Sequence, residues 1–331
     1  MIRNISVVGA GAWGTTLAAM TAQNTPTVLW ARRPELADEI HNEHRNSDYL
    51  PEFTLPQSLR ASSSLEDVVS GADVLVMAVP SHGYRAVAAE AARFLQPQVP
   101  VVSITKGLEH ASLKRMSEVT RDEMPGHPVA VLTGPNLAKE VLRGQPAASV
   151  VATEDEDLAA QLQRLFTRPS LRVYTNKDLV GCELAGVVKN IIAIASGMAD
   201  GMGLGDNTRA ALLTRGLGEM TRLGVALGGQ AGTFAGLAGV GDLMVTCWST
   251  QSRNNRLGVE LGRGRSVAEV VSEMHTVAEG LRSSKSMFEL ARRHGVYMPI
   301  TEQVMAVCHQ GRSAADALAA LMEPSYKSEF D

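Results

Sequence analysis

The chain has 331 residues, of which 45% are hydrophobic and 20% are charged, and these proportions exclude a disordered, collagen-like or coiled-coil protein. The formal net charge is -4, from 31 Lys and Arg against 35 Asp and Glu, so the composition argues against a nucleic-acid partner. Aromatic residues make up only 4% whereas glycine occurs 30 times, which suggests close helix packing and backbone turns. At roughly 150 residues per domain, this length predicts two domains.

The cysteines and the apolar runs indicate where the protein works. Cys182, Cys247 and Cys308 are far apart and lack a CxxC or any metal-ligand spacing, so we expect a reducing compartment and no metal site. No signal peptide is visible after Met1, and no uninterrupted apolar run reaches the roughly 18 residues that span a membrane. We therefore expect a cytoplasmic protein without membrane insertion.

The first half alternates short apolar runs with helical patterns, which is typical of βαβ units and a parallel sheet. From about Asp178 onward the pattern changes to long helical segments, so we place a domain boundary near that residue and expect a mostly helical second domain. The strands predicted in the first half are residues 4–8, 27–30, 73–79, 100–104, 129–132, 148–151 and 171–174.

A glycine-rich turn joins the first strand to the first helix. Its sequence is Gly9-Ala10-Gly11-Ala12-Trp13-Gly14, a GxGxxG pattern. In such a turn the first glycine permits the tight bend, the second lets the backbone approach a diphosphate, and the third lets helix and strand pack closely. The amino-terminal end of the helix attracts the anion. We therefore interpret the turn as a dinucleotide site, the alternative being a bare packing turn.

The end of the second predicted strand bears on the choice of cofactor. An NAD site usually has an acidic residue there for the ribose hydroxyl, but this chain has Arg32 and Arg33. A guanidinium suits a 2′-phosphate, so we expect NADPH to be accepted and NADP or NAD to be the cofactor. The alternative is that both arginines are solvated loop residues. Trp13 either packs under the nicotinamide or covers the sheet.

Two polar residues follow later strands. Lys106 comes just after the predicted strand 100–104, at the strand end where open parallel sheets bind ligands, although a solvated loop lysine is the alternative. Asn136 lies in the loop after strand 129–132, before a helical segment, and it is either a ligand residue or only a helix N-cap.

A buried helix is predicted for residues 184–199, which are apolar nearly all round. Lys189 is its only charged residue, and Asn190 is beside it. A buried ammonium needs a carboxylate partner or loses its charge, so Lys189 is either a catalytic residue or half of a structural salt bridge. Its expected partner is Asp242, the only acidic residue in a long apolar, glycine-rich stretch.

Ser252, Arg253 and Asn254 open another helical segment, with Ser252 in a position suited to an N-cap. A helix start with an arginine and an asparagine is either a second anion site or an ordinary cap.

These segments together resemble the glycerol-3-phosphate dehydrogenase family, the soluble nicotinamide-dependent bacterial type. The matching blocks run in one order over nearly the whole chain: residues 9–15, 105–107, 133–135, 178–190, 239–243, 252–254 and 277–280. The resemblance implies a Rossmann-type doubly wound parallel sheet in residues 1–180 and an all-α substrate-binding domain in residues 181–331. It also implies interconversion of dihydroxyacetone phosphate and sn-glycerol 3-phosphate, for phospholipid biosynthesis.

The resemblance further implies roles for individual residues. Lys189 is the expected proton donor and acceptor, and the other catalytic residues are Lys106, Asp242 and Asn190. Substrate is expected to meet Lys106, Gly134, Asn136, Lys189, Asp242, Ser252, Arg253 and Asn254. The cofactor is expected to meet Gly9, Gly11, Ala12, Trp13, Gly14, Arg32, Arg33, Lys106, Ala138, Arg253, Val277 and Glu279. Asn136 departs from the family, which usually has Ser or Thr there.

Two other functions are weighed against this one. A related reductase of another small hydroxy acid, such as 6-phosphogluconate or ketopantoate, would not resemble this chain in the blocks around Asp242 and Ser252. A non-catalytic nucleotide sensor would need no buried Lys189. A homodimer is expected only because glycine-rich helices often pack against a second copy.

Overall fold

The computed structural model describes residues 2–274 and 278–323, and the chain forms two compact units. The first unit holds residues 1–186 and 228–242, and the second holds residues 187–227 and 243–331. The chain therefore passes between units three times: inside the helix α8 (Leu179–Gly201), between residues 227 and 228, and at the start of α11 (Asp242–Trp248). The domain boundary predicted at residue 180 stays a prediction, because compact units need not be independently folding domains.

The first unit is built on an eight-stranded sheet in the order β3-β2-β1-β4-β5-β6-β7-β8. All neighbouring pairs are parallel except β6 and β7, so the predicted parallel sheet is in fact mixed and mostly parallel. The strands are β1 (Ile5–Val8), β2 (Thr27–Trp30), β3 (Leu59–Ser62), β4 (Val74–Met77), β5 (Val101–Ser103), β6 (Val129–Thr133), β7 (Ala147–Ala152) and β8 (Leu171–Asn176).

Two strands of this sheet differ from the sequence pattern for physical reasons. β3 was not predicted, because it is an edge strand of four residues in which only Leu59 is buried. β7 runs antiparallel to β6 because the segment between them carries only the short helix α6 (Ala138–Leu142), whereas a parallel return needs a full crossover.

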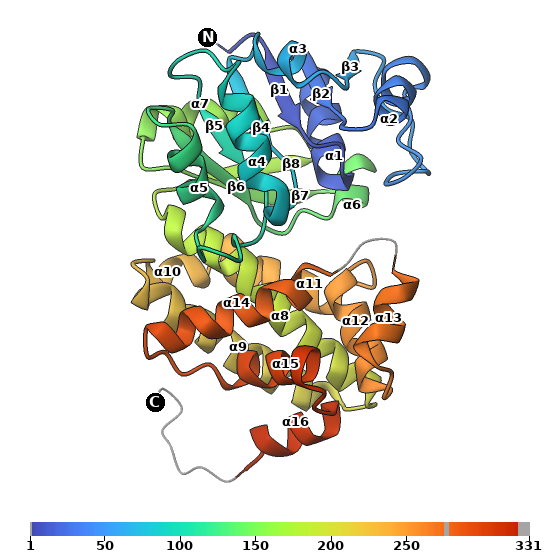
Figure 1. Cartoon of the computed structure of the whole chain (residues 1–331), viewed down its shortest axis with the longest axis vertical. Helices are drawn as coiled ribbons and strands as arrows, with labels where there is room; N and C mark the ends of the chain where they lie inside the picture. Colours follow the sequence, from blue (N-terminus) through green and yellow to red (C-terminus); the bar gives the residue numbers. More distant parts are fainter. Residues whose placement is uncertain (1, 275–277, 324–331) are drawn as a thin grey trace. The chain divides into compact units, whose positions relative to one another are not determined.

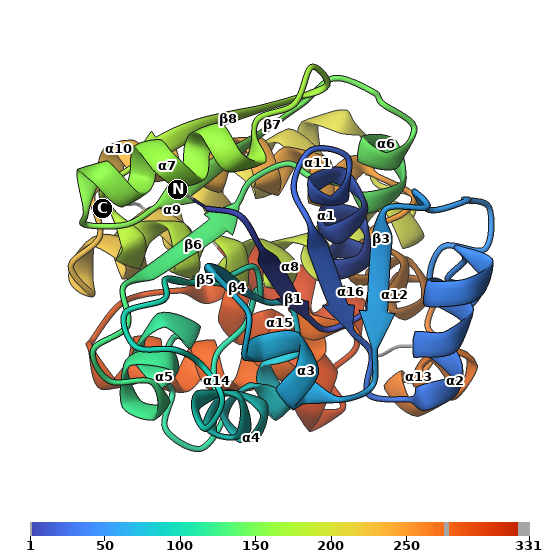
Figure 2. The same cartoon turned by 90° about the horizontal axis from the view of Figure 1, so that it is seen from above.

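Helices cover both faces of the sheet, which explains why its central strands are apolar throughout. Figure 2 shows α1 (Ala12–Ala22), α6 and α7 (Glu156–Phe166) on one face, and α3 (Leu65–Val69), α4 (Ser81–Ala92) and α5 (Met116–Glu123) on the other. Two buried apolar clusters, one on each face, join these helices to the sheet. Beside β3 lie α2 (Pro34–Asp38) and a π-helical segment, Glu39–Glu43.

The second unit is helical, as predicted, and Figure 1 shows its helices in yellow to red. By length and composition α8 could cross a membrane, but 94% of its most apolar window is buried, as in the core helix of a globular protein. The other helices of this unit are α9 (Asp206–Ala226), α11, α12 (Arg253–Gly262), α13 (Val267–Glu273), α14 (Glu279–Arg293), α15 (Pro299–Gln310) and α16 (Ala314–Leu321). The short α10 (Ala231–Phe234) and the π-helical segment Leu237–Gly241 belong to the first unit.

Glycines let α8 and α12 pack backbone against backbone. Gly197 and Gly201 on α8 face Gly258 and Gly262 on α12, each pair spaced by one helical turn. A Cβ atom added to Gly258 would lie 2.1 Å from the carbonyl oxygen of Ile194, and one added to Gly201 would lie 2.1 Å from that of Val259. This contact fixes the position of α12, and therefore of its first residues, along α8.

We predict that Gly258→Ala lowers the free energy of unfolding by about 2 kcal/mol or more, because the new methyl group must push the two backbones apart. Gly218→Ala, in the middle of α9, is the control, since its Cβ atom would meet only the Arg222 side chain, at 3.4 Å. That variant should be neutral or gain up to about 1 kcal/mol from helix propensity. Equal effects in urea unfolding would contradict the close-packing argument.

A buried carboxylate caps α15. The side chain of Glu219, 1% exposed on α9, accepts hydrogen bonds from the backbone N–H groups of Ile300 and Thr301 and from the Thr301 hydroxyl. Burial raises the pKa of Glu219 to about 7, although these hydrogen bonds oppose the shift. The folded state therefore binds this proton more tightly than the unfolded state does.

We predict that this carboxyl group makes the protein less stable as pH rises from about 4.5 to about 7, by up to about 3 kcal/mol. The stabilising contribution is complete below the unfolded-state pKa and is lost as pH passes the folded-state pKa. Glu219→Gln should flatten this slope in urea unfolding across that range, whereas Glu302→Gln, an exposed change in the first turn of α15, should not. The same slope in wild type and Glu219→Gln would refute the assignment.

Candidate functional site

Several predicted site residues follow strands that end at one edge of the sheet. The strands β1, β2, β5 and β6 are mutually parallel, so Gly9, Arg32, Lys106 and Gly134 come after their carboxyl ends. The chain proceeds outward from β1 in both directions, through β2 to β3 and through β4 to β6. Ligands of open α/β sheets bind at such a reversal of strand order.

The glycine-rich turn has the geometry that a dinucleotide requires. Gly9 has φ +123°, and a Cβ atom there would lie 2.7 Å from the Ala78 carbonyl oxygen. A Cβ atom on Gly14 would lie 2.1 Å from the Gly9 carbonyl oxygen, so these two glycines are needed for the turn itself. Gly11 is different, because a Cβ atom there would meet nothing within 4 Å. The open space beside Gly11, at the start of α1, fits a diphosphate.

The structure adds Asn46, which was not predicted, to this turn. Its side chain is fully buried and donates to the Ala10 carbonyl oxygen at 3.0 Å and to the Thr15 hydroxyl at 2.8 Å. The segment that carries Asn46 follows the π-helical residues 39–43, more than 30 residues from the turn in sequence. No local motif marks such a contact, so only the folded backbone reveals it.

The two arginines after β2 differ in their surroundings. Arg33 is the N-cap residue of α2 and forms an ion pair with Asp48, and both side chains are about half exposed. Arg32 is also exposed, and it makes no hydrogen bond or ion pair with any residue that the structure describes. Arg32 is therefore available for a ligand phosphate, and Arg33 is already engaged.

Trp13, Ala12 and Ala138 lie at the starts of helices on one face of the sheet. Ala12 is the first residue of α1 and Ala138 the first of α6, and these two helices pack together. Trp13 packs against the apolar cluster on this face, which supports the interpretation that it covers the sheet. Its indole N–H is buried and has no partner among the residues that the structure describes.

Lys106 and Asp242 form the charged centre of the first unit. The Lys106 ammonium donates to the Asp242 carboxylate at 2.8 Å, and to the Gly134 carbonyl oxygen and the Asn136 side-chain oxygen, both at 3.3 Å. The Asp242 side chain is 2% exposed and that of Lys106 22%. Asp242 thus has a cationic partner that sequence reasoning did not assign to it, and its pairing with Lys189 stays a prediction.

Asn136 is not the helix cap that the sequence allowed. The N-cap residue of α6 is Leu137, and the Asn136 side chain instead joins Lys106 to the Ser149 hydroxyl. A serine or threonine at this position would be shorter and could not reach in the same way. The amide therefore helps to hold the Lys106 ammonium in place.

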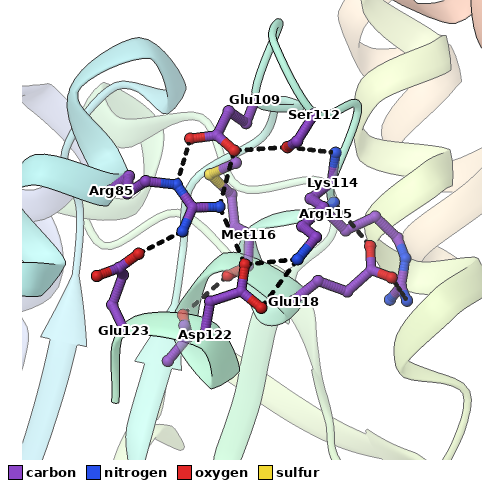
Figure 3. Close-up of polar contacts among 10 residues, drawn as sticks. Arg85, Glu109, Ser112, Lys114, Arg115, Met116, Glu118, Asp122 and Glu123 are labelled. Atoms are coloured by element: carbon purple, nitrogen blue, oxygen red, sulfur yellow. Dashed lines mark hydrogen bonds and ion pairs between the residues drawn. The ribbon is translucent and has the colours of Figure 1, made fainter. Parts of the chain in front are cut away.

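Ion pairs fasten the loop that carries Lys106, and Figure 3 shows them. Glu109, three residues after Lys106, receives two hydrogen bonds from Arg85 of α4, at 2.7 and 2.8 Å. Arg85 also contacts Asp122 and Glu123 of α5, so one guanidinium joins the loop to two helices. These contacts anchor the loop to α4 and α5 three residues after Lys106, which limits the movement of Lys106.

The same loop is joined to α8 through a buried carboxylate. Glu183, 7% exposed, accepts from the Ser117 backbone N–H at 2.8 Å and from the Arg115 guanidinium at 2.8 Å. Burial raises the pKa of Glu183, and the charge of Arg115 opposes that shift. The carboxylate therefore caps the amino-terminal end of α5 and fixes the first turns of α8, the helix that goes on to Lys189.

Lys189 and Thr246 form a buried polar pair in the second unit. Lys189 is 5% exposed, and its ammonium donates to the Thr246 hydroxyl at 2.9 Å. Sequence reasoning missed Thr246, although its spacing is informative: it lies one helical turn after Asp242 on α11. Lys189 follows Gly186 by three residues on α8. Gly186 itself lies against Lys106, because a Cβ atom on Gly186 would be 3.5 Å from the Lys106 side chain.

The predicted anion site at the start of α12 is partly built into the protein interior. Ser252 is the N-cap residue, as predicted, and accepts from the Asn255 backbone N–H. Asn254 donates to the Asn190 side chain at 2.9 Å and accepts from the Gly280 backbone N–H at 2.8 Å, so its amide is already engaged. Arg253 is exposed and has no polar partner among the described residues.

Two predicted cofactor residues, Val277 and Glu279, are two positions apart in the sequence. Glu279 is the first residue of α14, and Val277 lies outside the described residues. The three cysteines are buried and form no disulfide with one another, and within the described ranges no three residues of His, Cys, Asp or Glu gather as a metal site would require.

Comparison with known proteins identifies the family. A family model described as NAD-dependent glycerol-3-phosphate dehydrogenase N-terminus matches residues 4–159, and its C-terminus counterpart matches residues 178–319. The chain belongs to this family. Its activity is that of a glycerol-3-phosphate dehydrogenase that uses NAD(P)+, an oxidoreductase.

Relatives of this family match the chain over nearly its whole length. Glycerol-3-phosphate dehydrogenase (NAD(P)+) 2 of Sphingopyxis alaskensis is 54% identical over 325 residues, which cover 98% of each chain. The corresponding enzyme of Moorella thermoacetica is 49% identical over 324 residues, covering 98% of this chain and 96% of that one. The family and cofactor predictions are thus confirmed.

Solved structures give the same family and also a more distant likeness. The crystal structure of glycerol-3-phosphate dehydrogenase from Coxiella burnetii has a TM-score of 0.93 and 37% identity, covering 97% of this chain and 99% of that one. A ketopantoate reductase from Ralstonia eutropha has a TM-score of 0.62 and 15% identity, covering 95% and 99%. The second likeness is one of fold alone, so the fold by itself does not select the substrate.

Proposed function

We propose that this glycerol-3-phosphate dehydrogenase reduces dihydroxyacetone phosphate to sn-glycerol 3-phosphate, with Lys189 as the proton donor. The observation that carries the assignment is a lysine 5% exposed in an apolar core helix, held by a hydrogen bond to Thr246. A buried lysine with only a structural role would lower the stability of the fold, because its ammonium loses hydration on burial. A buried ammonium can, however, act as the general acid that donates a proton to the alkoxide forming on the substrate.

The cofactor site supports the same proposal. The turn at Gly9, Gly11 and Gly14 would hold the diphosphate, and Arg32 the adenosine end. Bound NAD(P)H supplies the hydride that reaches the C2 carbonyl carbon of the substrate. As negative charge develops on the carbonyl oxygen, the Lys189 ammonium donates its proton there, and in the reverse reaction the Lys189 amine accepts the hydroxyl proton.

Lys106 and Asp242 act with Lys189 in this proposal. The Lys106 ammonium stabilises the developing oxyanion, and Asp242 holds that ammonium in position. Asp242 and Thr246 lie one turn apart on α11, and each accepts a hydrogen bond from one of the two lysines: Asp242 from Lys106 and Thr246 from Lys189. Asn190 orients the Asn254 side chain at the start of α12, where Arg253 binds the substrate phosphate.

We further propose that the enzyme works in the cytoplasm and supplies phospholipid synthesis. The cysteines are buried and form no disulfide with one another, which supports a reducing compartment. The homodimer stays a prediction. Four glycines of the helical unit, Gly197, Gly201, Gly258 and Gly262, pack against each other within that unit and so do not provide a contact for a second copy.

The activity is tested by following the absorbance of the reduced nicotinamide with dihydroxyacetone phosphate as substrate. We expect oxidation of NADPH or NADH with this substrate and only background rates with ketopantoate or 6-phosphogluconate. Faster oxidation with either carboxylate would replace the proposal with the alternative reductase.

We predict that Lys189→Met, which keeps the length of the side chain without the amine, lowers kcat by about 100-fold to 10,000-fold, the usual contribution of a general acid. Affinity for NADPH, measured by fluorescence titration, should change by less than about twofold. Bound cofactor also shows that the variant is folded. Turnover within about threefold of wild type would rule out Lys189 as the proton donor.

We predict that Arg253→Gln raises the KM for dihydroxyacetone phosphate at least about tenfold, because a charge-assisted contact to the phosphate is lost. Activity with unphosphorylated dihydroxyacetone should hardly change. Arg256→Gln, an exposed arginine one turn later on α12, is the matched control. If both variants behave alike, Arg253 does not bind the phosphate.

A further inference from the structure

Asp48 lies beside Arg33, at the place where a Rossmann fold distinguishes NADP from NAD. Arg33 follows β2, and Asp48 reaches its guanidinium from a segment 15 residues later. The Rossmann fold conventionally has either a carboxylate at this place, for the ribose hydroxyls of NAD, or an arginine, for the 2′-phosphate of NADP. This chain has both, and they are paired with each other.

The segment that carries Asp48 is fastened to the cofactor site. Asn46, two residues before Asp48, donates to the Ala10 carbonyl oxygen within the glycine-rich turn and to the Thr15 hydroxyl of α1. Beyond Asp48, Glu52 binds Lys139 and Arg143 at 2.8 Å each. Because the segment is held on both sides of Asp48, its carboxylate stays beside Arg33.

We propose that Asp48 is a specificity-determining residue that restrains the preference for NADPH over NADH, because it competes with the 2′-phosphate for Arg33. This inference rests on the cofactor site proposed above. A bound 2′-phosphate meets Arg32 directly, but it gains Arg33 only by displacing Asp48, and it is repelled by the carboxylate that remains nearby. NADH carries no group that needs Arg33, so Asp48 imposes no comparable penalty on it.

The solvent exposure of the Arg33–Asp48 ion pair sets the size of the expected change in NADPH affinity. The Arg33 and Asp48 side chains are 54% and 43% exposed, so solvent screens their attraction. Exposed ion pairs shift equilibria by no more than about fivefold. Removing Asp48 also removes its repulsion of the phosphate, so we expect a change of about threefold to tenfold in favour of NADPH.

The test measures dissociation constants for NADPH and NADH by fluorescence titration without substrate, and then kcat/KM for each cofactor. Asp48→Asn should tighten NADPH binding by about threefold to tenfold and leave NADH binding within about twofold. Glu35→Gln is the matched control: it removes an exposed acidic group close to Arg33 that is not paired with it, and it should change neither affinity by more than about twofold.

A double-mutant comparison isolates the competition from general electrostatics. In the Arg33→Gln background, most of the gain from Asp48→Asn should disappear, because the released arginine is no longer there. Three results would each overturn the inference. The gain in NADPH affinity could be undiminished in the Arg33→Gln background, the affinities for both cofactors could rise equally, or Glu35→Gln could raise NADPH affinity as much as Asp48→Asn does. Failure of the proposed cofactor site is distinguishable, since wild type would then bind neither NADPH nor NADH.

Discussion

The buried carboxylate of Asp242 is the interaction on which the geometry of the charged centre depends. A carboxylate with a side chain 2% exposed is tolerated only when a cation and hydrogen-bond donors replace the lost water, and Lys106 provides the charge. The same ammonium contacts Gly134 and Asn136, so the segments after β5 and β6 converge with the start of α11. The Lys106 ammonium therefore holds Gly134, Asn136 and Asp242 together at the edge of the sheet.

Close backbone contacts provide the second constraint, and the abundant glycines explain them. In the first unit Gly9 and Gly14 allow α1 to start directly beside β1, which leaves the space next to Gly11 open for a diphosphate. In the second unit, Gly197 and Gly258 bring α8 and α12 together without side chains between them. The glycines thus serve binding in one unit and helix placement in the other.

Periodicity and local motifs predicted much of this fold and part of the site. Alternating apolar runs indicated seven of the strands and the glycine-rich turn, because these depend on neighbouring residues. The lone charge in a buried helix indicated Lys189. Asn46, Thr246 and the pairing of Lys106 with Asp242 could not be predicted in the same way, since each depends on side chains that meet across long stretches of chain. The edge strand β3 was missed because its residues are mostly exposed and carry little pattern.

The most direct measurement of the central claim uses Lys189→Cys before and after alkylation with bromoethylamine, which restores an amine less basic than that of lysine. Position 189 is as buried as the native cysteines, so both proteins are alkylated while unfolded and then refolded, and wild type treated in the same way controls for modification of the native cysteines. If Lys189 donates the proton, alkylation restores reduction of dihydroxyacetone phosphate, and the loss of kcat at high pH moves to lower pH than in wild type. Restored activity with the wild-type pH profile, or full activity before alkylation, would contradict the assignment.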